Sequence, residues 1–566
     1  MDSLVPWLWR GLMLVAVVGL QARAAEPLHA RIDALVDARL TVPAAGPAAD
    51  DEFLRRVYLD LTGSIPTAVQ ARAFLDDKAP DKRAKLIDAL LASPEFPRRM
   101  ADAWTLMLME RRTGDDANSL EWHEYLRASF EAGKPLDQLA REILSPDAED
   151  AKTRASALFI TKRLEQVGQN PVDHPRLTRD IGRLLLGMDL QCAQCHNHLT
   201  IKQYKQDDFQ GLYTFVGHTF IRRDMKFPAV GEKLVDKKTE FTSVFAVTPK
   251  QTGPRVPGDA EQVEIPAFPK GQEYAKPPDR KANFQGEPKF SPVKALGDRL
   301  PKTELFARNV ANRLWFLAMG RGIVHPLDLH HDANPPSHPE LLDLLAAELK
   351  GMKYDAKALL REVMLTKAYQ RSSIVPSQAK GDIPESQYAV ASLRRMSAEQ
   401  LATSVLVASG ELERVTAAKA APKVEKKIDP NADVNDDEKG LANKTTGPVT
   451  LKDARKKFLV AFAGPVGEAE VEFTPSLAAA LFVSNSEMIL DWLHPREGNL
   501  IARLTTQNDS AAVADELYLS VLTRRPTDEE RADVAAYLEK HKARRDAAIG
   551  ELAWALIAST EFCVNH

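Results

Sequence analysis

The stretch Leu186-Gly187-Met188-Asp189-Leu190-Gln191-Cys192-Ala193-Gln194-Cys195-His196-Asn197-His198 holds two of the chain's three cysteines and two of its 13 histidines. Apolar residues recur at helical spacing before it and after it. The residues that carry this pattern are Leu177, Ile181, Leu184 and Leu185 on one side, and Phe209, Leu212 and Phe215 on the other. We therefore expect the stretch to join two helices.

The spacing Cys192-x-x-Cys195-His196 is typical of covalent haem attachment, in which two thiols add to porphyrin vinyl groups and the next histidine ligates the iron. With three cysteines and 13 histidines among 566 residues, chance would produce the pattern only about four times in ten thousand such chains. The motif therefore predicts one covalent haem c, with His196 as an axial ligand. The opposite ligand is left open among Met225, His218, Met188 and His174, because His198 lies too close in sequence to reach that face.

Two other interpretations of the cysteine pair stay open. A zinc ion would draw its ligands from Cys192, Cys195, His196 and His198, although one short segment rarely completes a tetrahedral set. A disulfide between Cys192 and Cys195 would bind no cofactor at all. A second group of histidines, within Asp328-Leu329-His330-His331-Asp332 and at His338, is interpreted as a solvated loop.

The N-terminus indicates export. Residues 7–20 are mainly apolar and lead into Ala22-Arg23-Ala24, a small-x-small pattern typical of signal-peptide cleavage. We therefore predict a signal peptide over residues 1–24 and a mature protein in the periplasm or at the cell surface. Since no later segment is long and apolar enough, we expect no transmembrane span in the mature chain.

Composition limits the classes of partner. The chain has 75 basic and 79 acidic residues, so its charge gives no reason to expect nucleic acid as a partner. No glycine-rich phosphate loop, nucleophile elbow or HExxH pattern occurs. The sequence accordingly names no catalytic residue and makes no prediction of enzymatic activity.

The pattern of apolar residues predicts a mainly α fold, with multi-helical N-terminal and C-terminal halves and a small β-rich insertion between them. The predicted regions are helical residues 28–222, a Pro/Gly-rich insertion at 223–298 and helical residues 299–566, with a disordered loop at 417–452. Capping boxes are expected at Ser337 and Ser397. Residues 58–67 and 518–527 resemble each other, and each is followed by a Ser-x-Glu-Phe segment, which suggests a duplicated helical hairpin.

These motifs resemble two known families. Residues 55–63, 86–96, 190–198 and 206–209 are similar to the planctomycete surface cytochrome C-like family of the second type. Residues 308–315, 320–322, 334–342, 394–400 and 561–566 are similar to its companion, the planctomycete surface domain of the first type. The resemblance implies an exported, mainly helical protein whose first half is cytochrome-like, and it implies no established activity.

Two main hypotheses of function follow, and a haem peroxidase, which would need an open sixth position on the iron, is a third. The first is an exported haem c protein that serves electron transfer, or a related redox role, with an unidentified redox partner. The second is a surface binding or structural protein, associated with polysaccharide or another envelope component, in which the cysteine pair is structural or binds zinc.

Overall fold

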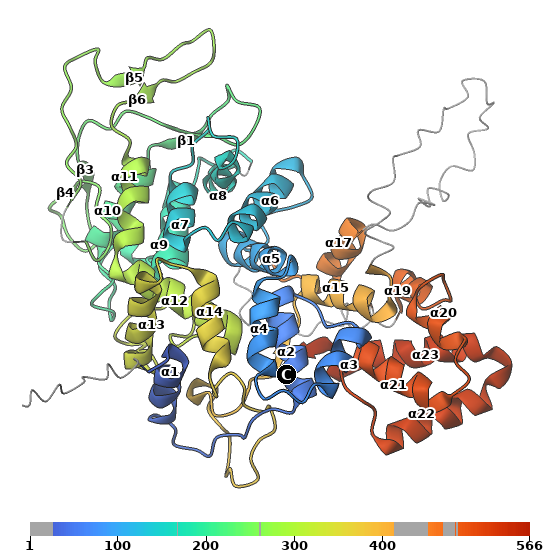
Figure 1. Cartoon of the computed structure of the whole chain (residues 1–566). Helices are drawn as coiled ribbons and strands as arrows, with labels where there is room; N and C mark the ends of the chain where they lie inside the picture. Colours follow the sequence, from blue (N-terminus) through green and yellow to red (C-terminus); the bar gives the residue numbers. More distant parts are fainter. Residues whose placement is uncertain are drawn as a thin grey trace, which may run out of the picture.

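The computed structural model describes residues 26–166, 168–259, 262–412, 451–467, 482 and 485–565. Helices dominate these residues, and their strands form only two-stranded antiparallel pairs, which confirms the mainly α fold (Figure 1). The predicted signal peptide and residues 417–450 of the predicted loop lie outside the described residues, whereas residues 451 and 452 begin a helix. No helix in the described ranges has the length and apolar composition of a membrane span.

The N-terminal half is a succession of helices: α1 (Leu28–Asp37), α2 (Asp50–Thr62), α3 (Ala68–Asp76), α4 (Lys82–Leu91), α5 (Glu95–Met109), α6 (Ala117–Glu131), α7 (Leu136–Leu144), α8 (Leu158–Leu164), α9 (His174–Leu186) and α10 (Gln206–Val216). Local sequence explains their ends. The side chain of Asp173 caps α9 by accepting the N–H of Arg176, and Gly187 ends it in the left-handed conformation at φ 70°.

The insertion is confirmed as three short antiparallel strand pairs: β1 (Thr219–Ile221) with β2 (Val230–Glu232), β3 (Thr239–Phe241) with β4 (Lys250–Thr252), and β5 (Tyr274–Lys276) with β6 (Glu287–Pro288). Residues 241–247 are rich in β-branched and aromatic side chains, but only Phe241 of this run lies in a strand. The rest of that run follows β3 as an exposed segment, which becomes important at the candidate site.

The C-terminal half contains α11 (Pro292–Arg299), α12 (Glu304–Met319), α13 (Pro339–Gly351), α14 (Ala356–Leu365), β7 (Arg394–Arg395), α15 (Ala398–Ser409), α17 (Leu451–Phe462), α19 (Glu487–Trp492), α20 (Leu500–Thr505), α21 (Ser510–Val521), α22 (Asp528–Lys540), α23 (Arg545–Ile557), α24 (Thr560–Cys563) and β8 (Val564–Asn565). The capping box at Ser397 is confirmed. The one predicted at Ser337 is wrong, because α13 begins at Pro339 after His338 and the Ser337 hydroxyl donates to the carbonyl of Ile323 instead.

The two similar segments form matching helical units. Thr67 begins α3 and Thr527 begins α22, each with a complete capping box, to Gln70 and Glu530 respectively. The units also contact each other, because α3 packs on α21 (Figure 1). Ion pairs of 2.6 Å between Arg72 and Glu516 and of 2.8 Å between Arg525 and Asp76 join them.

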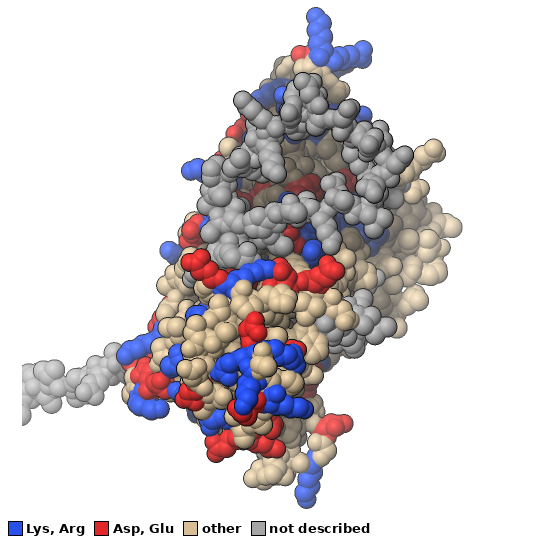
Figure 2. All heavy atoms as spheres, turned by 90° about the vertical axis from the view of Figure 1, so that its right-hand side faces the viewer, with Lys and Arg blue, Asp and Glu red and all other residues tan. Residues whose placement is uncertain are grey.

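Two hydrophobic cores stabilise the described residues. The larger one unites α1 to α14 and contains Trp122 and Trp315. The second is built around Trp492 from residues 396–562, together with Leu59 of α2 and Ile65. Helix α2 thus contributes to both cores. On the face formed by the C-terminal helices, basic and acidic side chains are interspersed, as the near-balanced composition predicts (Figure 2).

Candidate functional site

The Cys192-x-x-Cys195-His196 stretch forms a single turn between α9 and α10. Residues Cys192–Gln194 are a 3-10 helix, and the backbone N–H groups of Cys195 and His196 each donate to the carbonyl of Cys192 at 3.4 Å. Both cysteines are exposed and carry free thiols, so no disulfide joins them. The turn therefore presents the two thiols and the next histidine together at the surface.

The imidazole of His196 has one nitrogen free to act as a ligand. Its Nδ1 lies 2.7 Å from the carbonyl oxygen of Asn197. Because a carbonyl oxygen only accepts, Nδ1 is the protonated nitrogen, and the lone pair of the neutral ring lies on Nε2. A hydrogen bond from the opposite nitrogen is the arrangement that commonly orients histidine ligands.

An exposed apolar segment lies against this turn. The N–H of Val244 donates to the carbonyl of Cys195 at 3.1 Å, and the ring of Phe245 lies 4.8 Å from that of His196. The side chains of Val244, Phe245 and Val247 are 66%, 71% and 97% exposed. Leu199, which directly follows the cysteine stretch in sequence, is 76% exposed. Apolar groups gathered in this way usually mark a surface that something else covers. The free thiols, the available Nε2 and the apolar surface together fit a covalently attached haem.

His198 is engaged differently. Its Nδ1 accepts the backbone N–H groups of Ile201 at 3.0 Å and Thr200 at 3.2 Å, so the neutral ring carries its proton on Nε2. Neither nitrogen of that tautomer offers a free lone pair. Within the described ranges, no three His, Cys, Asp or Glu side chains are grouped so that they could hold a metal ion. The zinc set of Cys192, Cys195, His196 and His198 stays a prediction.

The four residues proposed for the opposite iron ligand lie in different surroundings. Met188 is buried and its backbone bridges to Leu329, whereas Met225 is half-buried. His174 Nε2 donates to the carbonyl oxygen of Thr219 at 2.8 Å, and burial lowers the pKa of His218. Among the described residues, no hydrogen bond or ring contact joins any of these four to the Cys192 turn.

The histidine-rich loop of the C-terminal half contacts residues on both sides of the Cys192 turn. The N–H of His330 donates to the carbonyl of Gly187 at 2.9 Å, and the hydroxyl of Tyr204 donates to the carbonyl of His330. The ring of His331 lies 5.3 Å from that of Tyr204. The interpretation of these histidines as solvated is wrong for His338, which is 2% exposed and packs on Tyr388.

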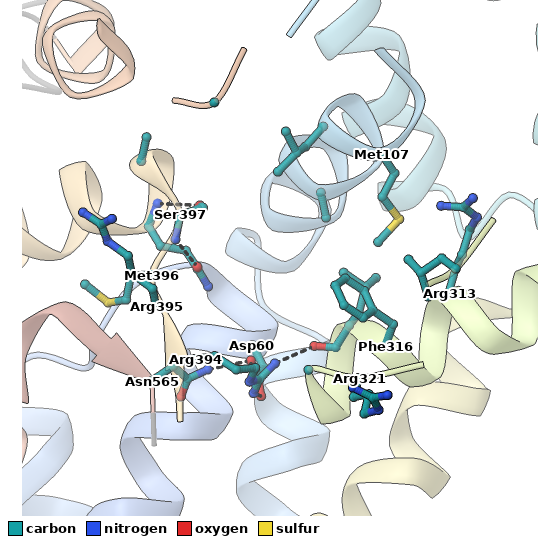
Figure 3. Close-up of a pocket in the computed structure, with 18 of the residues that line it drawn as sticks. Asp60, Met107, Arg313, Phe316, Arg321, Arg394, Arg395, Met396, Ser397 and Asn565 are labelled. Atoms are coloured by element: carbon teal, nitrogen blue, oxygen red, sulfur yellow. Dashed lines mark hydrogen bonds and ion pairs between the residues drawn. The ribbon is translucent and has the colours of Figure 1, made fainter. Parts of the chain in front are cut away.

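A second site contains no residue of the Cys192 turn. A cavity of about 740 Å³ opens between α5, α12, β7 and the end of α17 (Figure 3). Its wall includes Asp60, Met107, Phe316, Arg394, Phe462 and Asn565. We refer to this cavity as the arginine cleft, because Arg99, Arg313, Arg321, Arg394 and Arg395 all line it.

Asp60 and Arg394 form the floor of the arginine cleft (Figure 3). Arg394 donates to both carboxylate oxygens of Asp60 and to the carbonyl of Leu317, while the amide of Asn565 donates to Asp60 Oδ1 at 2.8 Å. Burial and the charge of Asp60 raise the pKa of Tyr369, whose hydroxyl donates to Asp60 Oδ2 at 2.9 Å. Since β7 pairs with β8, Arg394 and Asn565 are also neighbours in a strand pair.

A buried ion cluster forms the other end of the cleft. Glu110, which is 1% exposed, pairs with Arg112 and Arg183, and Asp328 pairs with Arg183 and Arg313. Burial alone would lower the pKa of Arg183, but the carboxylates around it raise that pKa well above its usual value. The guanidinium groups at this end are therefore held charged.

Sequence reasoning missed the arginine cleft. It drew on motifs that contain Asp60, Arg321, Arg394 and Asn565, yet assigned them no chemistry. No spacing rule connects them, because Asp60 is 334 residues from Arg394 and 505 residues from Asn565. The available signal was that charged residues recur in motifs from both halves of the chain.

Comparison with family models agrees with the resemblance that the sequence motifs predict. Residues 31–220 match the family model PSCyt2, described as a protein of unknown function (DUF1549), and residues 299–538 match PSD1, described as a protein of unknown function (DUF1553). No curated protein and no solved structure matches the chain. The predicted resemblance is confirmed: the chain joins a PSCyt2 domain to a PSD1 domain, in the order that its motifs predict.

Proposed function

We propose that this protein is exported and carries one haem c, bound through Cys192 and Cys195 with His196 as axial iron ligand, and that it serves electron transfer or a related redox role at the cell envelope. One observation carries the proposal. Two exposed free thiols lie on one turn with a histidine whose Nε2 is available, beside an exposed apolar segment at 244–247.

Attachment needs no further group from the protein. Each thiol adds across one vinyl group, so that an S–H and a C=C bond become a C–S and a C–H bond and nothing is released. When bound, the haem supplies a one-electron iron couple. His196 would donate its Nε2 lone pair, its Nδ1 hydrogen bond to Asn197 would orient the ring, and the exposed side chains of Phe245 and Val247 would offer apolar contact.

The test is to produce the chain in an exported form together with haem-attachment machinery, and to record its intact mass and its pyridine haemochrome spectrum. We expect the mass of one added haem and a Soret band. Cys192→Ser combined with Cys195→Ser removes both signals, whereas Cys563→Ser, which changes the remaining cysteine, keeps them. An unmodified mass without a Soret band in the wild-type chain excludes the proposal.

A second candidate function is a non-catalytic binding or structural role at the envelope, towards polysaccharide or another envelope protein. The observation that favours it is the separate core around Trp492, which contains no residue of the cysteine turn. In this case the double cysteine variant retains binding to a polysaccharide or envelope extract and loses only stability. Unchanged stability combined with lost redox activity would count against this role.

A further inference from the structure

We propose that the arginine cleft is a binding site for a small organic anion, whose charged group is a carboxylate, a phosphate or a sulfate. The site is distinct from the cysteine turn. It is formed by residues of both family domains, with Asp60 and Arg99 from the first and Arg313, Arg321 and Arg394 from the second. The proposal therefore does not depend on haem.

The carboxylates of the cleft are already neutralised. Asp60 pairs with Arg394, Asp328 with Arg313 and Arg183, Glu385 with Arg321, and Glu110 with Arg112 and Arg183. These pairs have N···O distances of 3.2 Å or less. None of these acidic groups is left to compensate a further cation. Positive charge beyond these pairs must be balanced by solvent or by a ligand.

Arg99 supplies such a charge. Its Nε donates to the backbone carbonyl of Asp60 at 3.3 Å, and no carboxylate of the described residues lies within ion-pair distance of its guanidinium. Burial lowers the pKa of Arg99 and the charge of Arg394 adds to this effect, while the more distant charges of Asp60, Asp102 and Glu399 oppose it without forming an ion pair. An anion bound in the cleft would interact favourably with both guanidinium groups, because arginine matches the geometry of carboxylate, phosphate and sulfate oxygens.

Buried polar atoms around the cleft also lack partners. Arg394 Nε and Arg313 Nε donate no hydrogen bond, and Asn565 Oδ1 accepts none, although Asn565 is only 3% exposed. Buried polar groups are rarely left unsatisfied, so each of these atoms calls for a specific explanation. Because all three atoms are closed off from solvent, a ligand in the cleft would reach them only after the side chains around them rearrange.

The size and the apolar wall of the cleft favour an organic molecule over a bare ion. Pockets of roughly 300–1,000 Å³ typically enclose small-molecule ligands, and this cavity measures about 740 Å³. Met107 and Phe316 lie on one side of it, and Met396 lies on the other (Figure 3). These groups offer apolar contact to the body of a ligand while the arginines bind its charge.

The experiment is isothermal titration calorimetry of the full mature chain with four compounds that share one sugar ring: glucuronate, glucose 6-phosphate, glucose 6-sulfate and neutral glucose. We expect at least one of the three anions to bind ten-fold more tightly than glucose, with an affinity that falls as salt is added. Which anion binds best identifies the charged group. The same affinity in the Cys192→Ser, Cys195→Ser protein shows that the site works without the cysteine turn.

Substitutions of arginines that line the cleft test whether the anion binds there. Arg99→Gln should weaken the preferred anion at least ten-fold, and Arg321→Gln, whose partner Glu385 is exposed, provides a second variant that keeps the buried pairs intact. Arg127→Gln is the matched control, because this arginine does not line the cleft and pairs with the exposed Glu124 and Glu131 on α6. The proposal is overturned if no anion binds more tightly than glucose, or if the cleft variants bind as well as the control.

Discussion

The guanidinium Nη2 of Arg394 lies 3.0 Å from Oδ1 and 2.8 Å from Oδ2 of Asp60, across 334 residues of sequence. Asp60 belongs to the PSCyt2 domain and Arg394 to the PSD1 domain. The Asp60 side chain is 2% exposed, so water screens this pair weakly. The ion pair therefore fixes β7 against α2 and sets the floor of the arginine cleft.

Asp60→Asn should destabilise the protein strongly. The variant leaves Arg394 without its carboxylate and weakens the acceptor of Tyr369. Removing one partner of a buried pair typically costs about 3–5 kcal/mol. Asp88→Asn, which breaks the half-exposed pair with Arg361, should cost about 1 kcal/mol or less. Urea unfolding monitored by circular dichroism measures both, and similar losses for the two variants would contradict a dominant role for the Asp60 pair.

The duplicated helical units should respond equally to loss of their caps. Thr67→Ala and Thr527→Ala each remove the hydroxyl that accepts a backbone N–H in a capping box. Each should lower the free energy of unfolding by about 1 kcal/mol. Replacement by Ser, which keeps the hydroxyl, should restore most of that stability at either position. A large loss at one site and none at the other would show that the two units are not equivalent in energy.

The features that could be predicted from the sequence are those that depend on neighbouring residues. The turn at Cys192, the box at Ser397 and the β-rich insertion depend on residues that are close in sequence, and the structure confirms the box and the presence of short strands in the insertion. The predicted box at Ser337 failed because Pro339 begins the helix and the Ser337 hydroxyl finds an acceptor in the distant Ile323. Side-chain alternatives supplied by tertiary contacts cannot be read from spacing.

The arginine cleft could not be predicted from the sequence. Its floor combines α2, β7 and β8, whose pairing depends on packing of the whole chain. In sequence, Asp60 is one acidic residue in an amphipathic helix and Arg394 is half of a basic pair, and such residues are usually solvated. Only burial turns them into a site, and burial of a charged residue follows from the position of its partner.

Acidification should destabilise the protein through His338. Burial, together with the charge of Arg39, lowers the pKa of His338 from an ordinary 6.5 to about 4. Between these values the unfolded chain binds more protons than the folded one. The contribution is therefore favourable above pH 6.5 and is lost as the pH falls to 4, by at most about 3 kcal/mol.

The check compares urea unfolding between pH 7 and pH 4 for the wild type, His338→Gln and His494→Gln. His338→Gln should reduce the loss of stability in this window but not abolish it, because burial lowers the pKa of His330 to about 3 and its contribution remains. His494 is exposed, so its replacement should leave the wild-type profile unchanged. If both variants follow the wild-type curve, His338 does not titrate as its burial predicts.

Alanine substitutions at two glycines distinguish the cost of backbone strain from the cost of disturbing a contact between the two domains. Gly187 and Gly133 have φ values of 70° and 63°, so alanine at either position is strained by about 1–2 kcal/mol. A Cβ at Gly187 would lie 2.5 Å from Cδ2 of His330, whereas a Cβ at Gly133 would meet nothing within 4 Å. Gly187→Ala must therefore also displace the histidine loop of the PSD1 domain from the turn that leads to Cys192.

We expect Gly187→Ala to lower the free energy of unfolding by about 1–3 kcal/mol more than Gly133→Ala, as overpacking does in a close-packed interior. His330 resists displacement because its N–H donates to the carbonyl of Gly187 and its ring lies beside Asn312. Chemical denaturation of the two variants measures the difference. Hydrogen exchange at the His330 amide should also rise in Gly187→Ala alone. Equal destabilisation with unchanged exchange would mean that His330 moves aside freely, and that the PSD1 loop does not hold the cysteine turn in place.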